Sequence, residues 1–366
     1  MNTPAGQTSA LPIVFAADGN FSVPLAIAVE SLLQSARPET RYDIHVLDDG
    51  VLDFAKRYLE TLHSRYAFTI TYHPVAEMVQ GVAVTHYFPR VSFARFMIPE
   101  MLAAACGPRI FYSDADVLFT DDLSDLFRMD MQGKSLAGIQ ELAVLAEGNR
   151  KHLQEWASQF GFSPQEDLYC NSGNLLFDCK VWVQRGHARR IMELAHAQAG
   201  ASARFPDQDI LNAVCQGDMA LVPPRYCAIP LYGEHYASED PDLHFQHACR
   251  YSREELQQAA VNPALIHFAG QKPRVLEGAR YPLEQRFIDF WAKSAWRDYM
   301  PYSPRIGSMS PSRFIKLNVP ISSQLGVLRK ELLKYTVASC LPLPKRRHYA
   351  GQRAGLRRVL QNARPC

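Results

Sequence analysis

Short apolar runs alternate with amphipathic segments in the first part of the chain, and this alternation constrains the fold most. Residues 11–17, 42–47 and 68–72 have the character of buried strands, whereas residues 25–36 and 54–66 space their apolar side chains as one helix face does. A strand followed by a helix and another strand builds a mostly parallel sheet with helices on both faces. The sequence therefore predicts an α/β fold.

The regular alternation of predicted strands and helices is less clear after residue 90. The patterns predict a short helix at 92–98 that ends at Pro99, strands at 109–112, 174–177 and 264–268, and helices at 182–198 and 284–299. Three prolines and four serines between residues 301 and 312 predict a linker. We therefore expect three parts: a body over 11–275, a helical extension and linker over 276–312, and a tail over 313–366.

Charge separates the tail from the rest of the chain. The last 54 residues contain 12 of the 39 Lys and Arg residues but only one of the 37 Asp and Glu residues, Glu331. The net charge of +2 thus divides into −9 before Arg313 and +11 from there onward. A polybasic segment of this kind is typical of contact with an anionic partner.

The first ten residues and the cysteines predict a cytoplasmic location. Residues 1–10 contain no Lys or Arg and precede no long apolar segment, so no signal peptide is expected. No run reaches the ~18 apolar residues of a membrane-spanning helix. The 8 Cys residues form no C-x-x-C pair, and we expect them to be reduced thiols.

Two carboxylates, Asp114 and Asp116, follow the predicted strand at 109–112. In an extended chain both side chains project to the same side, at the strand end where open α/β sheets bind ligands. Carboxylates prefer hard divalent cations, which in turn bind diphosphate oxygens. The alternative is a polar exit from the strand, because Asp is common in turns.

Another predicted strand, at 264–268, ends in His267 and is followed by Gly270 and Lys272. The imidazole is a possible third metal ligand, the glycine permits close backbone approach, and the ammonium suits a phosphate. A histidine packed at a strand end beside a solvated lysine is the alternative.

Two further polar segments precede predicted elements. Asp207 and Gln208 lie just before a helix, where they suit either helix capping or hydrogen bonds to sugar hydroxyls. Asn171 and Ser172 precede the strand at 174–177 and suit either a polar turn or a ligand pocket.

These four segments, in this order and preceded by Phe-Ala-Ala-Asp-Gly-Asn at 15–20, resemble the family 8 glycosyltransferases. That family includes bacterial lipopolysaccharide galactosyl- and glucosyltransferases and glycogenin. The resemblance spans residues 11–275 and implies a GT-A fold, with a Rossmann-like nucleotide-binding half continuous with an acceptor-binding half. It also implies Mn²⁺-dependent transfer of galactose or glucose from a UDP-sugar with retention of configuration, Mg²⁺ being the other candidate ion.

The resemblance also implies a role for each matching residue. Asp114, Asp116 and His267 would hold the metal, and Arg95 would lie near the donor sugar and Asp114. The remaining matches would bind uridine and ribose (Ala16, Asp18 and Asn20), the donor sugar (Asn171, Ser172, Asp207 and Gln208) and the diphosphate (Gly270 and Lys272). We expect Arg95, Asp207 and Gln208 to be the residues closest to catalysis.

Four positions depart from the family pattern. Arg274 replaces the usual Trp after Pro273, and a single residue instead of two separates Gly270 from Lys272. Gly19 replaces the second acid of the front loop, and Gln140 replaces an Asp of related galactosyltransferases. The last change predicts a different acceptor.

In the tail, Ile321, Leu325, Leu328, Leu332 and Tyr335 share one helical face, with bases on the others. This pattern predicts a helix at an anionic membrane surface. The alternative is a helix docked on the acidic body. Nucleic-acid binding is not expected, because no aromatic platform accompanies the bases.

The preferred interpretation is a peripheral enzyme on the inner face of the plasma membrane that transfers a hexose to lipopolysaccharide or another glycolipid. A transferase acting on a protein or soluble glycan, and a UDP-sugar-binding protein without turnover, are the alternatives.

Overall fold

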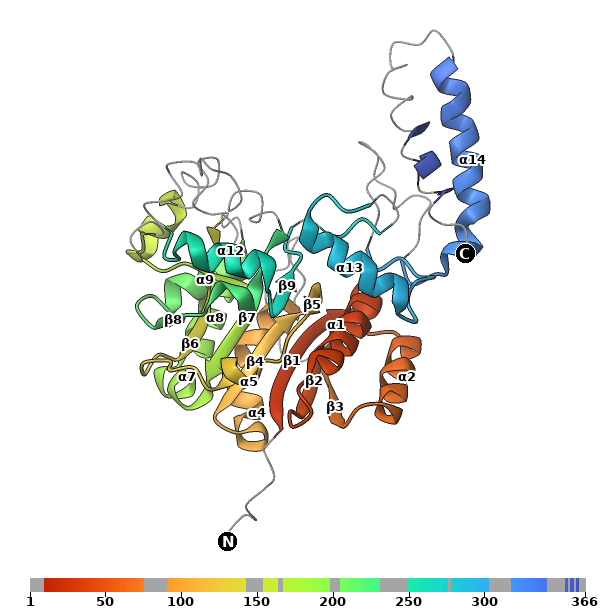
Figure 1. The fold of residues 1–366 in the computed structure, drawn as a ribbon. Helices are drawn as coiled ribbons and strands as arrows, with labels where there is room; N and C mark the ends of the chain where they lie inside the picture. The colour runs from red at the N-terminus through yellow and green to blue at the C-terminus, as the bar shows by residue number, and fades with distance from the viewer. Residues whose placement is uncertain are drawn as a thin grey trace.

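A seven-stranded mixed sheet forms the centre of the molecule, with strand order β3-β2-β1-β4-β7-β6-β8 (Figure 1). The structure, a computed structural model, describes residues 10–75, 91–142, 154–163, 167–197, 205–230, 249–270, 272–275, 278–302, 317–340, 353–354, 356–358 and 360–361. The strands of this sheet are β1 (Leu11–Asp18), β2 (Tyr42–Asp49), β3 (Phe68–Pro74), β4 (Arg109–Asp114), β6 (Leu136–Gln140), β7 (Cys170–Asp178) and β8 (Met219–Leu221).

The predicted strand–helix alternation is confirmed in the first half of the sheet. β1 pairs in parallel with β2 on one side and with β4 on the other, and β2 pairs in parallel with β3. The strands β2 and β3 are therefore added on one side of β1, and the chain then crosses to the other side of β1 to form β4. Because crossovers between parallel strands are right-handed, the connections on the two sides of β1 cover opposite faces of the sheet. Open α/β sheets bind ligands where the strand order reverses in this way.

The second half of the sheet departs from the parallel pattern. β7 runs antiparallel to both β4 and β6. A separate two-stranded sheet pairs β5 (Val117–Phe119) antiparallel with β9 (Leu265–His267). Strand β9 thereby returns to the carboxyl end of β4 from about 150 residues later in the chain.

Helices surround the sheet and bury its apolar side chains. Ile13, Phe15, Ile44 and Ile110 are fully buried at 0% exposure. The described helices of the body are α1 (Ser22–Ser35), α2 (Asp53–Thr61), α3 (Val91–Ala94), α4 (Ile98–Cys106), α5 (Ser124–Phe127), α7 (Cys179–Arg185), α8 (His187–His196), α9 (Pro206–Val214), α12 (Arg253–Val261) and α13 (Pro282–Lys293).

Four local predictions are wrong. The helix predicted over 284–299 begins at Pro282 and ends at Lys293. Pro99 does not end a helix but lies in the first turn of α4, where its missing N–H costs nothing. The single helix predicted over 182–198 is two helices that meet at Gly186, whose φ of 64° is left-handed. Residues 170–173 are not a turn before a strand, because they form the first half of β7.

The C-terminal part of the chain contains the predicted helix, α14 (Ile321–Cys340), which Figure 1 shows extending beyond α13. Its predicted apolar face is largely covered by protein, since Ile321 and Leu328 are 6% and 1% exposed and Leu325 and Leu332 are half-buried. The amide of Asn318, just before α14, donates a hydrogen bond to the Gly19 carbonyl (2.8 Å). The tail is therefore attached to the loop that follows β1.

Most of the predicted linker at 301–312 lies outside the described residues, as do the base cluster at 345–347 and the side chain of Tyr335 in the tail. The two linker residues that the structure describes, Pro301 and Tyr302, are buried. The domain boundaries at 275 and 312 remain predictions. Among the helices that the structure describes, none is long and apolar enough to cross a membrane.

Two glycine substitutions should change stability in opposite directions. Gly186→Ala should lower the free energy of unfolding by roughly 1 kcal/mol, because a Cβ disfavours the left-handed backbone. Gly326→Ala, within α14, should raise it by about 0.5 kcal/mol, because an added Cβ meets nothing within 4 Å and alanine favours a helix. Urea denaturation measures both, and a stabilised Gly186→Ala protein would contradict the assigned helix break.

Candidate active site

Asp114, Asp116 and His267 converge at the carboxyl end of β4. One ligand atom from each lies within 4.8 Å of the others. The His267 Nε2 is 3.5 Å from Asp116 Oδ1 and 3.8 Å from Asp114 Oδ2. The β5–β9 pairing produces this arrangement, because Val117 lies opposite His267 in the antiparallel register.

This donor set fits a divalent cation. Carboxylate oxygens and an imidazole suit Mn²⁺ and similar metals. A Cβ added at Gly173 would lie 2.5 Å from His267 Cε1 and 2.6 Å from Asp114 Oδ2. The backbone of β7 therefore forms one wall of the site, and only glycine fits there.

Arg95 lies behind the carboxylates and is 4% exposed. Its guanidinium is 3.3 Å from Asp114 and 3.5 Å from Asp207, and it donates a hydrogen bond to the Ser172 carbonyl (2.7 Å). It also packs over the Tyr112 ring at 4.7 Å. Burial lowers the pKa of Arg95, but the two aspartates outweigh that effect, so the side chain stays charged.

Lys272 reaches the metal-ligand group despite the shortened spacing from Gly270. Its ammonium donates to Asp116 Oδ2 and, at 3.1 Å, to the Phe268 carbonyl. Burial raises the pKa of Asp116, but Lys272 and His267 outweigh burial and hold it well below its usual range. Burial raises the pKa of Asp114 in spite of Arg95, and the charge on Asp116 adds to that increase. The two carboxyls are therefore electrostatically different.

The predicted sugar-pocket residues are buried and form hydrogen bonds within the protein. The Ser172 hydroxyl donates to Asp207 (3.2 Å), and the Ser172 N–H donates to Gln208 Oε1 (3.0 Å). Asn171 accepts from the Gly173 N–H (2.9 Å) and donates to Glu141 (2.6 Å). Neither Asp207 nor Gln208 caps helix α9 through its side chain. This favours the ligand-pocket interpretation over the capping one.

The front loop lies at the end of β1. Ala16 is paired in register with Asp114, which places β1 beside the metal-ligand group. Asp18 accepts hydrogen bonds from the backbone N–H groups of Asn20 (2.9 Å) and Phe21 (3.0 Å) and so caps a short 3₁₀ turn. A Cβ at Gly19 would lie 3.1 Å from the Gly50 carbonyl, so this loop is built for glycine rather than for the acid of the family pattern.

Several residues that complete the site were not predicted. The Tyr112 hydroxyl donates to Asp114 (2.6 Å), and Cys227 contacts His267 Nδ1 through its sulfur (3.6 Å). Tyr169 bonds both Asp209 and, at 3.2 Å, the Gln208 amide. Tyr112 could have been found from the strand alternation, because it is two residues before Asp114 on the same face. Nothing in the sequence pairs Cys227 with His267.

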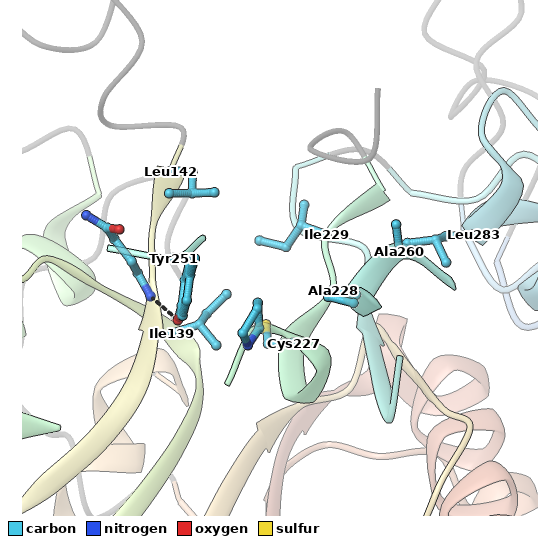
Figure 2. A pocket seen from close by; sticks show the side chains of 11 residues that line it. Ile139, Leu142, Cys227, Ala228, Ile229, Tyr251, Ala260 and Leu283 are labelled. Atoms are coloured by element: carbon cyan, nitrogen blue, oxygen red, sulfur yellow. Dashed lines mark hydrogen bonds between the residues drawn. The ribbon is translucent and has the colours of Figure 1, made fainter. Parts of the chain in front are cut away.

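A small apolar hollow lies beside His267, and Cys227 lines it (Figure 2). Its volume of about 10 Å³ is the room for one water molecule and is too small for a sugar ring. Gln140 also lines it, and its side-chain oxygen accepts from the Arg250 N–H (2.8 Å). The amide that replaces the family's acid is thus part of the packing around this hollow.

Comparison with known proteins decides the family. A profile described as glycosyl transferase family 8 matches residues 12–273, well over half of the chain. The chain belongs to this family. Family 8 members are sugar-transferring enzymes of a group that typically uses a divalent metal, in agreement with the Asp-Asp-His site.

Individual relatives are distant. General stress protein A of Bacillus subtilis is 21% identical over 286 residues, which cover 78% of this chain and 94% of that protein. Lipopolysaccharide 1,2-glucosyltransferase of Escherichia coli K12 is 22% identical over 294 residues, or 80% of each chain.

Solved structures show the GT-A fold. Galactosyltransferase LgtC, in complex with donor and acceptor sugar analogues, superimposes with a TM-score of 0.60 at 22% identity, covering 78% of this chain and 96% of LgtC. The bifunctional glycosyltransferase WbbM gives a TM-score of 0.63 at 19% identity, covering 81% of this chain, which spans about half of WbbM. The predicted family and fold are therefore confirmed.

The pKa of His267 depends on Asp116. Burial lowers this pKa, but the Asp116 carboxylate outweighs burial and holds it well above its ordinary value. In metal-free protein, charged His267 therefore stabilises the fold at low pH, and this stabilisation is lost as the pH rises through the folded-state pKa. Asp116→Asn should lower the His267 pKa, as measured by NMR titration of the imidazole after chelation. Asp130→Asn, on an exposed turn, is the control; an unchanged His267 pKa in Asp116→Asn would contradict this coupling.

Proposed function

We propose that this protein transfers a hexose, galactose or glucose, from a UDP-sugar to a lipopolysaccharide or other glycolipid, with retention of configuration and dependence on Mn²⁺. The observation that carries the proposal is the group Asp114, Asp116 and His267 with Lys272 beside it, in a family 8 chain. The lipopolysaccharide 1,2-glucosyltransferase among its relatives supports the acceptor class.

The leaving group sets the main chemical demand. Cleavage of the sugar–phosphate bond places negative charge on the UDP β-phosphate while positive charge grows at the anomeric carbon. Asp114, Asp116 and His267 would hold a divalent ion, Mn²⁺ or alternatively Mg²⁺, which would supply positive charge to the diphosphate. Lys272, which is bound to Asp116 in this structure, would add a second positive charge when UDP leaves.

Arg95 and the residues around it orient the donor sugar. The guanidinium fixes Asp114 and Asp207 relative to each other, and Ser172 on β7 donates a hydrogen bond to Asp207 on α9. Asn171, Ser172 and Asp207 would contact the donor sugar from these two elements, while Asp18 and Asn20 would bind the ribose and uridine from the end of β1. Gly270, whose φ is 68°, allows the chain to turn toward the diphosphate.

Among the described residues that match the family pattern, none is suited to attack the anomeric carbon. The Gln208 oxygen already accepts the Ser172 N–H, and an amide is a weak nucleophile. Asp207 is paired with Arg95 and hydrogen-bonded to Ser172. We therefore favour attack by the acceptor hydroxyl on the face that UDP leaves, with the leaving phosphate taking the acceptor's proton.

Removing one metal ligand tests the proposal. Asp114→Ala should abolish Mn²⁺-dependent release of UDP from UDP-galactose and UDP-glucose in the presence of a glycolipid panel, because the diphosphate charge is no longer neutralised. Gly173→Ala should have a similar effect, because its Cβ occupies the space between His267 and Asp114.

The control for both is Gly326→Ala, where an added Cβ contacts nothing within 4 Å. Retained turnover in Asp114→Ala would contradict the metal assignment. UDP-sugar binding without turnover on any glycolipid, protein or soluble glycan would instead identify a binding protein, and turnover only on protein or soluble glycan would refute the glycolipid acceptor.

We further propose that the tail brings the enzyme to an anionic membrane surface on the cytoplasmic side. Because the apolar face of α14 is covered, the contact would rest on exposed bases, including Arg329, Lys330, Arg357 and Arg358. Each base near anionic lipid contributes about 1 kcal/mol. Val327 and Leu333, 44% and 66% exposed, add apolar surface on α14.

Charge reversal on α14 tests this attachment. Arg329→Glu with Lys330→Glu should weaken binding to phosphatidylglycerol-containing vesicles at least about thirtyfold, because loss of the two bases alone is worth roughly 2 kcal/mol, and should leave UDP-sugar hydrolysis unchanged. Reversal of the exposed pair Arg189 and Arg190 on α8 is the matched control. Equal vesicle binding by the α14 variant and the parent protein would refute the proposed membrane attachment through the tail. Reversal is preferable to deletion of residues 313–366, which would also remove the Asn318–Gly19 hydrogen bond.

A further inference from the structure

A second group of metal-ligating side chains lies on β2, away from the site just described. Asp43 Oδ2 and the Cys106 sulfur are each 3.1 Å from His45 Nε2, and the ligand atoms all lie within 4.8 Å of one another. Asp43 and His45 point to the same face of β2 because they are two residues apart, and Cys106 is the last residue of α4. Three potential ligands from two elements thus converge on one point.

A fourth side chain orients the histidine. The Nε2 of His73, on the neighbouring strand β3, is 2.9 Å from His45 Nδ1. When Nδ1 donates its proton to His73, Nε2 presents its lone pair to the space shared with Asp43 and Cys106. Histidines that bind metals are held in this way by a hydrogen bond to the other ring nitrogen. The Thr69 hydroxyl bonds Asp43 and fixes the carboxylate similarly.

We propose that Asp43, His45 and Cys106 bind a zinc ion, with His73 as a positioning residue. A thiolate, an imidazole and a carboxylate are a zinc donor set, and three protein ligands leave a fourth tetrahedral position open. In such a site, nitrogen and sulfur ligands are about 3.5 Å apart, so the present contacts need to change by only a few tenths of an ångström. The oxygen-rich group at Asp114 favours harder ions, and the two sites therefore differ in metal preference.

The place of this group in the fold suggests what the ion would do. Arg95 lies in the 3₁₀ turn just before α4, Cys106 ends α4, and β4 then leads to Asp114. A zinc ion would fasten the end of α4 to β2 and so hold the chain between two residues of the candidate active site. A reactive-thiol role fits less well, because burial, with a smaller effect of Asp43, raises the pKa of Cys106 to about 11.

Cobalt titration tests the proposal independently of any transferase activity. The full-length protein with Asp114→Asn and Asp116→Asn, which disable the other site, is stripped of metal by a chelator under reducing conditions and titrated with Co²⁺. We expect a thiolate-to-cobalt charge-transfer band that saturates at one ion per chain and disappears on addition of Zn²⁺. Absence of this band would overturn the proposal and leave a hydrogen-bonded Asp–His–His group only.

Matched variants assign the ligands. Cys106→Ser should eliminate the band, whereas Cys249→Ser, at another half-buried cysteine, should retain it. Asp43→Asn provides a second ligand variant that should weaken cobalt binding. His73→Phe should keep the band but weaken cobalt affinity about 10- to 100-fold, as loss of an orienting partner does elsewhere. A band that survives Cys106→Ser would overturn the proposed site, and unchanged affinity in His73→Phe would overturn the positioning role.

Discussion

The buried guanidinium of Arg95 is the interaction on which the candidate active site depends. A charge in the protein interior is costly unless it is paired and hydrogen-bonded, and Arg95 meets Asp114 from β4, Asp207 from α9 and the Ser172 carbonyl from β7. These partners come from two strands of the sheet and from a helix that packs beside it. The charge thus fixes the position of the carboxylates at the end of β4 relative to the polar residues of β7 and α9.

Strand pairing brings His267 to the two carboxylates, Asp114 and Asp116. The parallel pairing of β1 with β4 places Ala16 beside Asp114, and the antiparallel pairing of β5 with β9 places His267 beside Asp116. A shift of one residue in the β5–β9 register would turn His267 to the other face of the small sheet. Gly173 in β7 then leaves the space that the convergent side chains require.

Prediction from the sequence succeeded where a pattern is local. The strands at 11–17, 42–47 and 68–72 and the helix at 25–36 are present, because period-2 and period-3.6 patterns of apolar residues report directly on burial. Prediction failed where contacts with distant parts of the chain decide the local structure. Gly186 separates two helices that share a continuous amphipathic pattern, and the polar residues Asn171 and Ser172 belong to a strand because β4 and β6 flank it. Propensity assigns polar residues to turns, and tertiary pairing overrides that preference.

The fold class, the family and the three candidate metal ligands could be predicted from the sequence, because short motifs and apolar periodicity are properties of neighbouring residues. The tertiary structure alone decided that Lys272 reaches Asp116, that Cys227 contacts His267, that the apolar face of α14 is covered, and that Asp43, His45 and Cys106 meet. Each of these contacts joins residues from different elements, and their distance depends on strand order, register and helix placement. Those quantities are set by the packing of the whole chain, and no local pattern contains them.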